Sequence, residues 1–330
     1  MQNPRFSVFL SFFCLLTLSG LSEPSKFDRS FSIVSDNDSI GNLDGDYSAG
    51  MELFWTGSSR TSIDEVNALP GVLKRLVALT PLGNGEVDLL GSRISIGQKI
   101  YTPRNLRSRE LLSNDRPYAG WTYLDMSLFA RNKDRIDGVV LSLGIVGPSS
   151  FADEVQENVH KVFGAVKVRG WENQLGNELA LNLSYQRERR IWERSIERDY
   201  SMELVSLGRL SLGNVDTSLS YGLRWRGGRE LVSDFDRGPS VAKGGKSRFR
   251  FSHLVELKGF LVGRNMFLDG NTFRDSHSVD KNLAVVETSM GVGYGNEKAR
   301  VRMLIFFRSK EFDQQESYSR FVRIALEFGY

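Results

Sequence analysis

The stretch "DTSLSYGLRWR" (216–226) alternates apolar and polar side chains with a period of two residues. The stretches 287–295, 300–307 and 320–330 show the same alternation. This period is typical of β-strands that expose one apolar face, so the sequence predicts an all-β protein. In 216–226, one face holds Thr217, Leu219, Tyr221, Leu223 and Trp225, and the other holds Ser218, Ser220, Gly222, Arg224 and Arg226.

The alternating segments are about ten residues long, and turn residues separate them, as in transmembrane β-barrels. Residues 1–22 have the pattern of a secretory signal peptide, with Arg5 before an apolar core. Residues 23–330 are then predicted to form one antiparallel β-barrel in the outer membrane of a Gram-negative-type envelope. The final residue, Tyr330, is the aromatic typical of chains assembled there. The alternative is a soluble β fold whose apolar face points inward.

Charge and composition exclude two other classes of protein. The chain of 330 residues carries 43 Lys and Arg against 40 Asp and Glu, and this near balance argues against nucleic acid as a partner. No apolar run after residue 22 approaches the roughly 20 residues of a spanning helix, which excludes a helical membrane protein. Cys14 is the one cysteine and falls within 1–22, so the mature chain is predicted to contain no disulfide.

One segment, 147–165, has the pattern of a helix instead of a strand. Ser149 or Ser150 is the expected N-cap, and Gly164 the expected stop. Gln156 and His160, four residues apart, share one face. We expect this short helix at a rim of the barrel or dipping into its lumen. Its predicted apolar stripe is Val155, Val159, Val162 and Phe163.

The stretch "SDNDSIGNLDGDYSAGMELFW" (35–55) collects oxygen ligands before a strand. Carboxylate and amide oxygens suit a hard cation such as Ca²⁺. A solvated turn is the alternative interpretation. The alternation in this strand predicts that Ser48 faces the lumen at the barrel mouth, close to Asn37 and Asp38.

Five motifs occur in an order that resembles the outer-membrane lipid A 3′-O-deacylase family: "DNDS…GDYSAG", "QKIYTPRNL", "NDRPYAGW", "SLGIVGPSSFADEVQENVHKVFGA" and "GWENQLGNELALNLSYQRE". The resemblance implies a barrel of about twelve strands with a short helix near the active-site rim. It also implies a Ca²⁺-dependent ester hydrolase that removes the 3′-linked acyloxyacyl group of lipid A, the membrane part of lipopolysaccharide, in the outer leaflet.

Carried onto this sequence, the family's catalytic residues fall on Asn37, Asp38, Gln156 and His160, with Asp38 as the Ca²⁺ ligand. Ser48 stands where the family pattern has threonine. The resemblance implies that His160 is the base that activates water.

The family's lysine has no match, and a basic cluster of Arg104, Arg107 and Arg109 takes its place as the predicted contact for a lipid A phosphate. A covalent route with Ser48 as nucleophile is the alternative within catalysis. A non-catalytic outer-membrane barrel, either a small porin or a structural or adhesive surface protein, is the alternative outside it.

Overall fold

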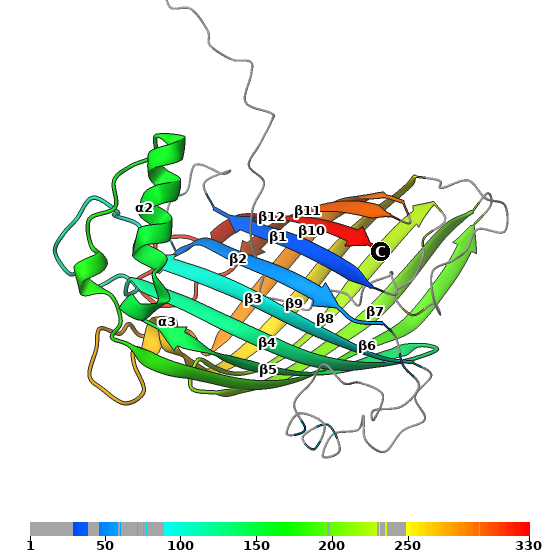
Figure 1. The fold of residues 1–330 in the computed structure, drawn as a ribbon, viewed down its shortest axis with the longest axis horizontal. Coiled ribbons are helices and arrows are strands. Elements are labelled where there is room, and N and C mark those ends of the chain that lie inside the picture. The colour runs from blue at the N-terminus through cyan, green and yellow to red at the C-terminus, as the bar shows by residue number, and fades with distance from the viewer. Residues whose placement is uncertain are drawn as a thin grey trace, which may run out of the picture.

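Twelve antiparallel strands close into a β-barrel in the computed structural model, which describes residues 29–38, 46–58, 60, 71, 75, 77, 89–196, 199–229, 231, 235, 249–296 and 298–330 (Figure 1). The fold class and the strand number predicted from the sequence are confirmed. The predicted signal peptide lies outside the described residues. The strands are β1 Ser30–Asn37, β2 Asp46–Thr56, β3 Leu89–Thr102, β4 Ala119–Asn132, β5 Arg135–Val146, β6 Glu178–Ile196, β7 Tyr200–Gly213, β8 Asp216–Arg229, β9 Arg250–Asn265, β10 Ala284–Gly295, β11 Ala299–Arg308 and β12 Ser319–Gly329.

The first and last strands pair and complete the barrel. Ser30 lies opposite Gly329, and Asn37 lies opposite Val322. The start of β1 and the end of β12 therefore share one end of the barrel, which we call the terminal end. The opposite end carries the helices α2 Ala152–Phe163 and α3 Met266–Asp269 (Figure 1), and we call it the helix end.

The apolar face of the strands points away from the barrel. On β8, Leu219, Tyr221 and Leu223 are exposed, whereas Arg224 and Arg226 are buried. A soluble barrel would reverse this arrangement, because water excludes apolar side chains into the interior. The observed arrangement is that of a barrel in lipid, so the soluble alternative is wrong.

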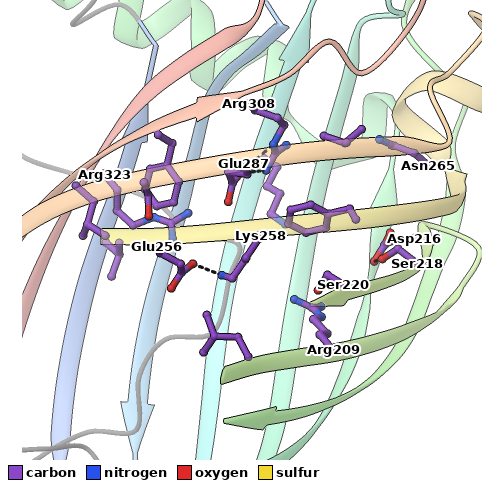
Figure 2. Close-up of a pocket in the computed structure, with 18 of the residues that line it drawn as sticks. Arg209, Asp216, Ser218, Ser220, Glu256, Lys258, Asn265, Glu287, Arg308 and Arg323 are labelled. Atoms are coloured by element: carbon purple, nitrogen blue, oxygen red, sulfur yellow. Dashed lines mark hydrogen bonds and ion pairs between the residues drawn. The ribbon is translucent and has the colours of Figure 1, made fainter. Parts of the chain in front are cut away.

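Ion pairs cross the interior. Arg224 donates to Glu188 at 3.1 Å and to Glu256 at 2.7 Å, which links β8 to β6 and β9. A cavity of about 260 Å³ remains among these side chains (Figure 2). Buried charges are tolerated when they are paired in this way. Further pairs join Arg308 to Glu287 and Glu311, Arg226 to Glu203, Lys258 to Glu256, and Arg323 to Asp36.

The predicted helix is present, but it begins differently. Its N-cap is Phe151, with φ 57°, and no side chain caps it, so the prediction of Ser149 or Ser150 as N-cap is wrong. Ser150 instead donates its hydroxyl to the carbonyl of Gly147 at 2.6 Å. Gly164, with φ 66°, ends the helix as predicted, because glycine adopts this left-handed conformation without strain. The helical elements are the 3₁₀ turns η3 Pro148–Ser150 and η4 Trp171–Asn173 and the α-helices α2 Ala152–Phe163 and α3 Met266–Asp269.

None of the helices in the described part of the chain is long and apolar enough to cross a membrane.

Candidate active site

A row of outward-facing residues crosses the wall near the helix end. Asn37 pairs with Ala49, Ala49 with Ile100, and Ile100 with Gly120. Directly paired residues share a face of the sheet. Ile96 is four positions from Ile100 on β3, so the two side chains share a face of the sheet. Because Ile96 is exposed on the outside of the barrel, the whole row faces outward. Asn37 therefore lies on the outside of the barrel wall.

The segment η3–α2 packs on this same outer face. The carbonyl of Ser150 accepts hydrogen bonds from Gln98 Nε2 at 2.7 Å and Thr122 Oγ1 at 2.8 Å. A Cβ on Gly120 would lie 2.2 Å from Ala152 Cβ and from Ser150 Oγ, so only glycine lets the segment approach so closely. The prediction of a helix at the rim is confirmed, and the alternative that it dips into the lumen is wrong, because η3–α2 lies against the outside of the wall.

The orientation of the His160 ring is fixed by its own loop. His160 Nδ1 lies 2.6 Å from the carbonyl oxygen of Val166. A carbonyl can only accept, so Nδ1 carries the proton and, in the neutral ring, Nε2 carries the lone pair. No described residue bonds Nε2. His160, half-buried on α2, is thus held in the tautomer of a general base.

Gln156 lies one turn before His160 and is held equally firmly. Its Oε1 accepts a hydrogen bond from Trp171 Nε1 at 2.9 Å, and its side chain is 4% exposed. Because the indole N–H only donates, it must face the amide oxygen. The amide NH₂ then points away from Trp171, and no other described residue accepts from it. Gln156 is thus an oriented donor beside His160.

Trp171 is held in turn by the loop that precedes β4. Its ring lies 5.3 Å from that of Tyr118, at 50°. Burial, and after it the negative charges of Asp115 and Glu172, raise the pKa of Tyr118 to about 12, so Tyr118 stays neutral. Tyr118 therefore acts as a packing surface under Trp171.

The end of β1 supplies Asn37 and Asp38 at the same end of the barrel as α2 (Figure 1). Asp38 is buried. Its neighbour Asp36 faces the lumen and accepts two hydrogen bonds from Arg323, at 2.7 and 2.9 Å, so its charge is compensated. Asp38 is the acid that the family resemblance implies as the Ca²⁺ ligand.

Ser48 occupies a β-bulge between Tyr47, which pairs with Tyr101, and Ala49, which pairs with Ile100. A bulge interrupts the alternation of inward and outward side chains. The prediction that Ser48 faces the lumen, which rested on unbroken alternation, therefore loses its basis. The Ser48 side chain itself lies outside what the structure describes.

Two spans can be estimated, one across the sheet from Asn37 to Gly120 and one along α2 from Ala152 to His160. Asn37 and Gly120 are three strand spacings apart, which is about 14 Å. From Ala152, which touches Gly120, eight helical residues lead to His160 and span about 12 Å. In Figure 1, α2 extends from the β3–β4 side toward the β1–β12 side. The helix rests on β3 and β4, so His160 and Asn37 lie at the same end of the barrel.

The three predicted arginines lie on the loop between β3 and β4. Arg104 is held by the β11–β12 loop, because its guanidinium donates to Glu316 at 3.0 Å and Ser317 Oγ at 2.8 Å. Arg107 and Arg109 are exposed, and their guanidinium groups bond no residue that the structure describes. Arg107 and Arg109 are thus the better placed of the three to bind an anion.

This loop is tied to the segment that follows α2. The backbone N–H of Arg169 donates to Leu106 at 2.9 Å, and the side-chain amide of Asn173 donates to the Arg109 carbonyl at 2.7 Å. The basic loop and the Gln156–His160 face are therefore parts of one surface.

The donor set at the end of β1 fits a hard cation. The Asp38 carboxylate and the Asn37 amide offer oxygen ligands, and Ca²⁺ completes its shell with backbone carbonyls and water. Within the described ranges, no group of three or more His, Cys, Asp or Glu side chains converges to hold a metal ion. The Ca²⁺ site at Asn37 and Asp38 stays a prediction of the family resemblance.

The other histidines have structural contacts. His277 Nε2 lies 2.7 Å from the Asp115 carbonyl. His253 lies on β9 near the terminal end, 3.3 Å from the Tyr200 hydroxyl and against the Trp225 ring. Neither histidine belongs to the candidate site.

The chain is an outer-membrane β-barrel, because its outer wall is apolar, its interior holds ion pairs and its strands close on themselves. The candidate site is polar and lies on the outside of the wall. Residues 8–330 match the family described as outer membrane protein LpxR, and the chain belongs to this family. Family and architecture make it a lipid A deacylase-like outer-membrane barrel.

Similarity to one solved structure supports the fold. The chain is similar to LpxR from Salmonella typhimurium, with a TM-score of 0.71 at 18% identity, over 91% of this chain and all of that one. The β domain of the Bordetella autotransporter BrkA matches with a TM-score of 0.46 at 9% identity, over 93% of this chain and all of that one. No curated protein matches the chain.

Proposed function

We propose that this protein is a lipid A 3′-O-deacylase, an ester hydrolase that removes the 3′-linked acyloxyacyl group of lipid A in the outer leaflet. The observation that supports this most directly is the hydrogen bond from His160 Nδ1 to the Val166 carbonyl. It leaves a basic Nε2 on the outer face of the wall, where an ester in the membrane can reach it.

In the proposed reaction, His160 Nε2 takes a proton from water as the water oxygen attacks the ester carbonyl. The tetrahedral intermediate collapses when the bond to the sugar 3′-oxygen breaks, and His160 returns the proton to that oxygen. The products are the free acyloxyacyl acid and a sugar hydroxyl. The oriented NH₂ of Gln156 is a donor for the developing oxyanion or for the attacking water.

Asp38 and Asn37 are the residues that would hold Ca²⁺. When bound, Ca²⁺ supplies Lewis-acid polarisation of a carbonyl. Arg107 and Arg109 would bind a lipid A phosphate and so orient the sugar, because guanidinium groups bind phosphate in a bidentate manner.

Mass spectrometry of lipid A, incubated with the purified protein in detergent and Ca²⁺, tests the proposal. We expect loss of the acyloxyacyl mass with the wild type and no loss with His160→Ala or His160→Asn. His253→Ala, near the terminal end, is the matched control and should keep its activity. Heat-modifiable migration in gels shows that each variant is folded.

Undiminished deacylation by folded His160→Ala would remove the base assignment. No deacylation by the wild type would favour the non-catalytic barrel. Ser48→Ala should slow the reaction by about 10²–10³-fold if Ser48 only donates to the oxyanion. An acyl group trapped on Ser48 would instead establish the covalent route.

A further inference from the structure

Three valines of α2 are exposed instead of buried against the barrel wall. Val155, Val159 and Val162 are 38%, 44% and 73% exposed, and Phe151, immediately before the helix, is 59% exposed. The buried residues of α2 include the polar Gln156. This differs from the usual surface helix of a globular protein, which turns its apolar stripe to the core.

The side chains of α2 fall into three separate sectors. Successive residues turn by about 100°, so Val155, Val159 and Val162 lie within about 60° of arc. Gln156 centres the sector buried against the wall, about 90° away from the valines. Exposed Glu154 lies in the third sector, which is polar. The valine sector is therefore apolar, the Gln156 sector is buried against the wall, and the Glu154 sector is polar and exposed.

We infer that the apolar flank of α2, formed by Phe151, Val155, Val159 and Val162, contacts the acyl chains of the surrounding lipid. The helix then lies flat at the membrane interface. Three surroundings match the three sectors: the protein wall, the apolar edge of the leaflet and water. Helices with an apolar and a polar face lie in this way at the boundary between headgroups and acyl chains.

Continuity with the lipid-facing wall identifies lipid as the occupant. The segment η3–α2 rests on the outer face of β3 and β4 through Gly120. Ile96 and Leu124, exposed on the same face of these strands, belong to the apolar outer wall of this outer-membrane barrel. A lipid layer that covers this wall reaches the adjoining flank of α2 without any partner protein.

A consequence for the substrate rests on the proposed function. Val159 and His160 are neighbours in the sequence, so the candidate base lies at the level where acyl chains begin. The ester of a lipid can then reach His160 sideways along the leaflet, while its chains stay among other chains.

Spin labels on single cysteines test the inference in vesicles of phosphatidylethanolamine and lipopolysaccharide. The variants Val159→Cys, Glu154→Cys and Leu124→Cys are made in a Cys14→Ser background, which leaves one labelled site. Leu124 reports the lipid-facing wall, and Glu154 is the matched control on the polar sector of the same helix. Electron paramagnetic resonance compares how well oxygen, which enters lipid, and a water-soluble nickel complex relax each label.

We expect the label at residue 159 to resemble that at 124, with a several-fold higher ratio of oxygen to nickel accessibility than at 154. A label at 159 that nickel reaches as easily as at 154 would overturn the inference. So would a label that neither reagent reaches, since that result means protein covers the flank. The readout does not use activity, so it stands or fails independently of the proposed deacylation.

Discussion

Replacing Trp171 by phenylalanine removes a single donor from the candidate site. Trp171 Nε1 donates to Gln156 Oε1 at 2.9 Å, and the Gln156 side chain is 4% exposed, so water cannot readily replace the indole. Phenylalanine keeps an aromatic ring against Tyr118. The substitution therefore tests the hydrogen bond more than the packing.

The size of the effect follows from leaving a buried acceptor unpaired, which costs about 1–3 kcal/mol of folding free energy. The amide torsion of glutamine is broad and roughly two-fold, so without the indole the amide can turn. If about 1–2 kcal/mol of orientation is lost, the productive arrangement becomes about 5–30-fold rarer. We expect kcat to fall by this factor and KM to change little, because Trp171 acts through Gln156.

Rates of lipid A deacylation in detergent, with folded protein quantified by heat-modifiable migration, measure the effect. Trp192→Phe is the matched control: Trp192 is 43% exposed on β6 and no described residue bonds its indole, so its loss should not matter. The pH profile should keep its shape, since His160 remains bonded to Val166.

A double-mutant cycle decides whether Trp171 acts through Gln156. In a Gln156→Ala background, Trp171→Phe should cost nothing further in kcat. If the two losses add in full, Trp171 does not act by positioning Gln156. An unchanged kcat in the single Trp171→Phe variant would also refute the reasoning.

Three other substitutions or measurements test the site and the barrel. Gly120→Val should push η3–α2 off the wall and lower deacylation at least tenfold, because a Cβ there meets Ala152 and Ser150 at 2.2 Å. The barrel should still show heat-modifiable migration, and normal activity would contradict that packing. The double variant Arg107→Gln, Arg109→Gln should raise KM for lipid A by about 10-fold or more, with little effect on a substrate that lacks phosphate. Arg169→Gln is the exposed control, and equal losses on both substrates would argue against phosphate binding. Reconstituted in planar bilayers, the protein should show none of the steady conductance of a porin, since ion pairs such as Arg224 with Glu188 and Glu256 cross the lumen; large stable channels would revive the porin alternative.

The strands could be predicted because the alternation of apolar and polar residues is visible within each strand. Where Leu219, Tyr221 and Leu223 alternate with serines and arginines, the period alone separates a lipid face from a lumen face. The chain-closing pairing of β1 with β12 needs no special signal, because a barrel in lipid cannot leave an edge unpaired.

The helix was harder to predict, because its environment is not water alone. Val155, Val159 and Val162 form the stripe that a soluble protein would bury, and the sequence cannot say that lipid lies beyond it. The prediction of the N-cap was wrong for a local reason. Phe151 adopts a left-handed φ of 57°, a conformation that an L-residue with a large side chain rarely takes, so no sequence pattern points to it.

The site was predicted as a set of residues but not as a surface. His160 and Gln156 do share a face of α2, as their spacing predicts. The bulge at Ser48 could not be predicted, because alternation carries no warning of a bulge, and so the facing of Ser48 stays a prediction. The role of Trp171 could not be predicted, since a tryptophan after a glycine does not reveal which amide it will contact.

The ion pairs that fill the lumen have a consequence for the cell. A protein that acted on lipid at its outer wall, as proposed, would need no open bore, and here Arg224, Arg308 and their partners form ion pairs across it. If the bore conducts no ions, as predicted above, the outer membrane can hold many copies without losing its barrier to small polar solutes. A molecule meant to block the site must first dissolve among the lipids, so its partition into the leaflet would govern its potency as much as its fit.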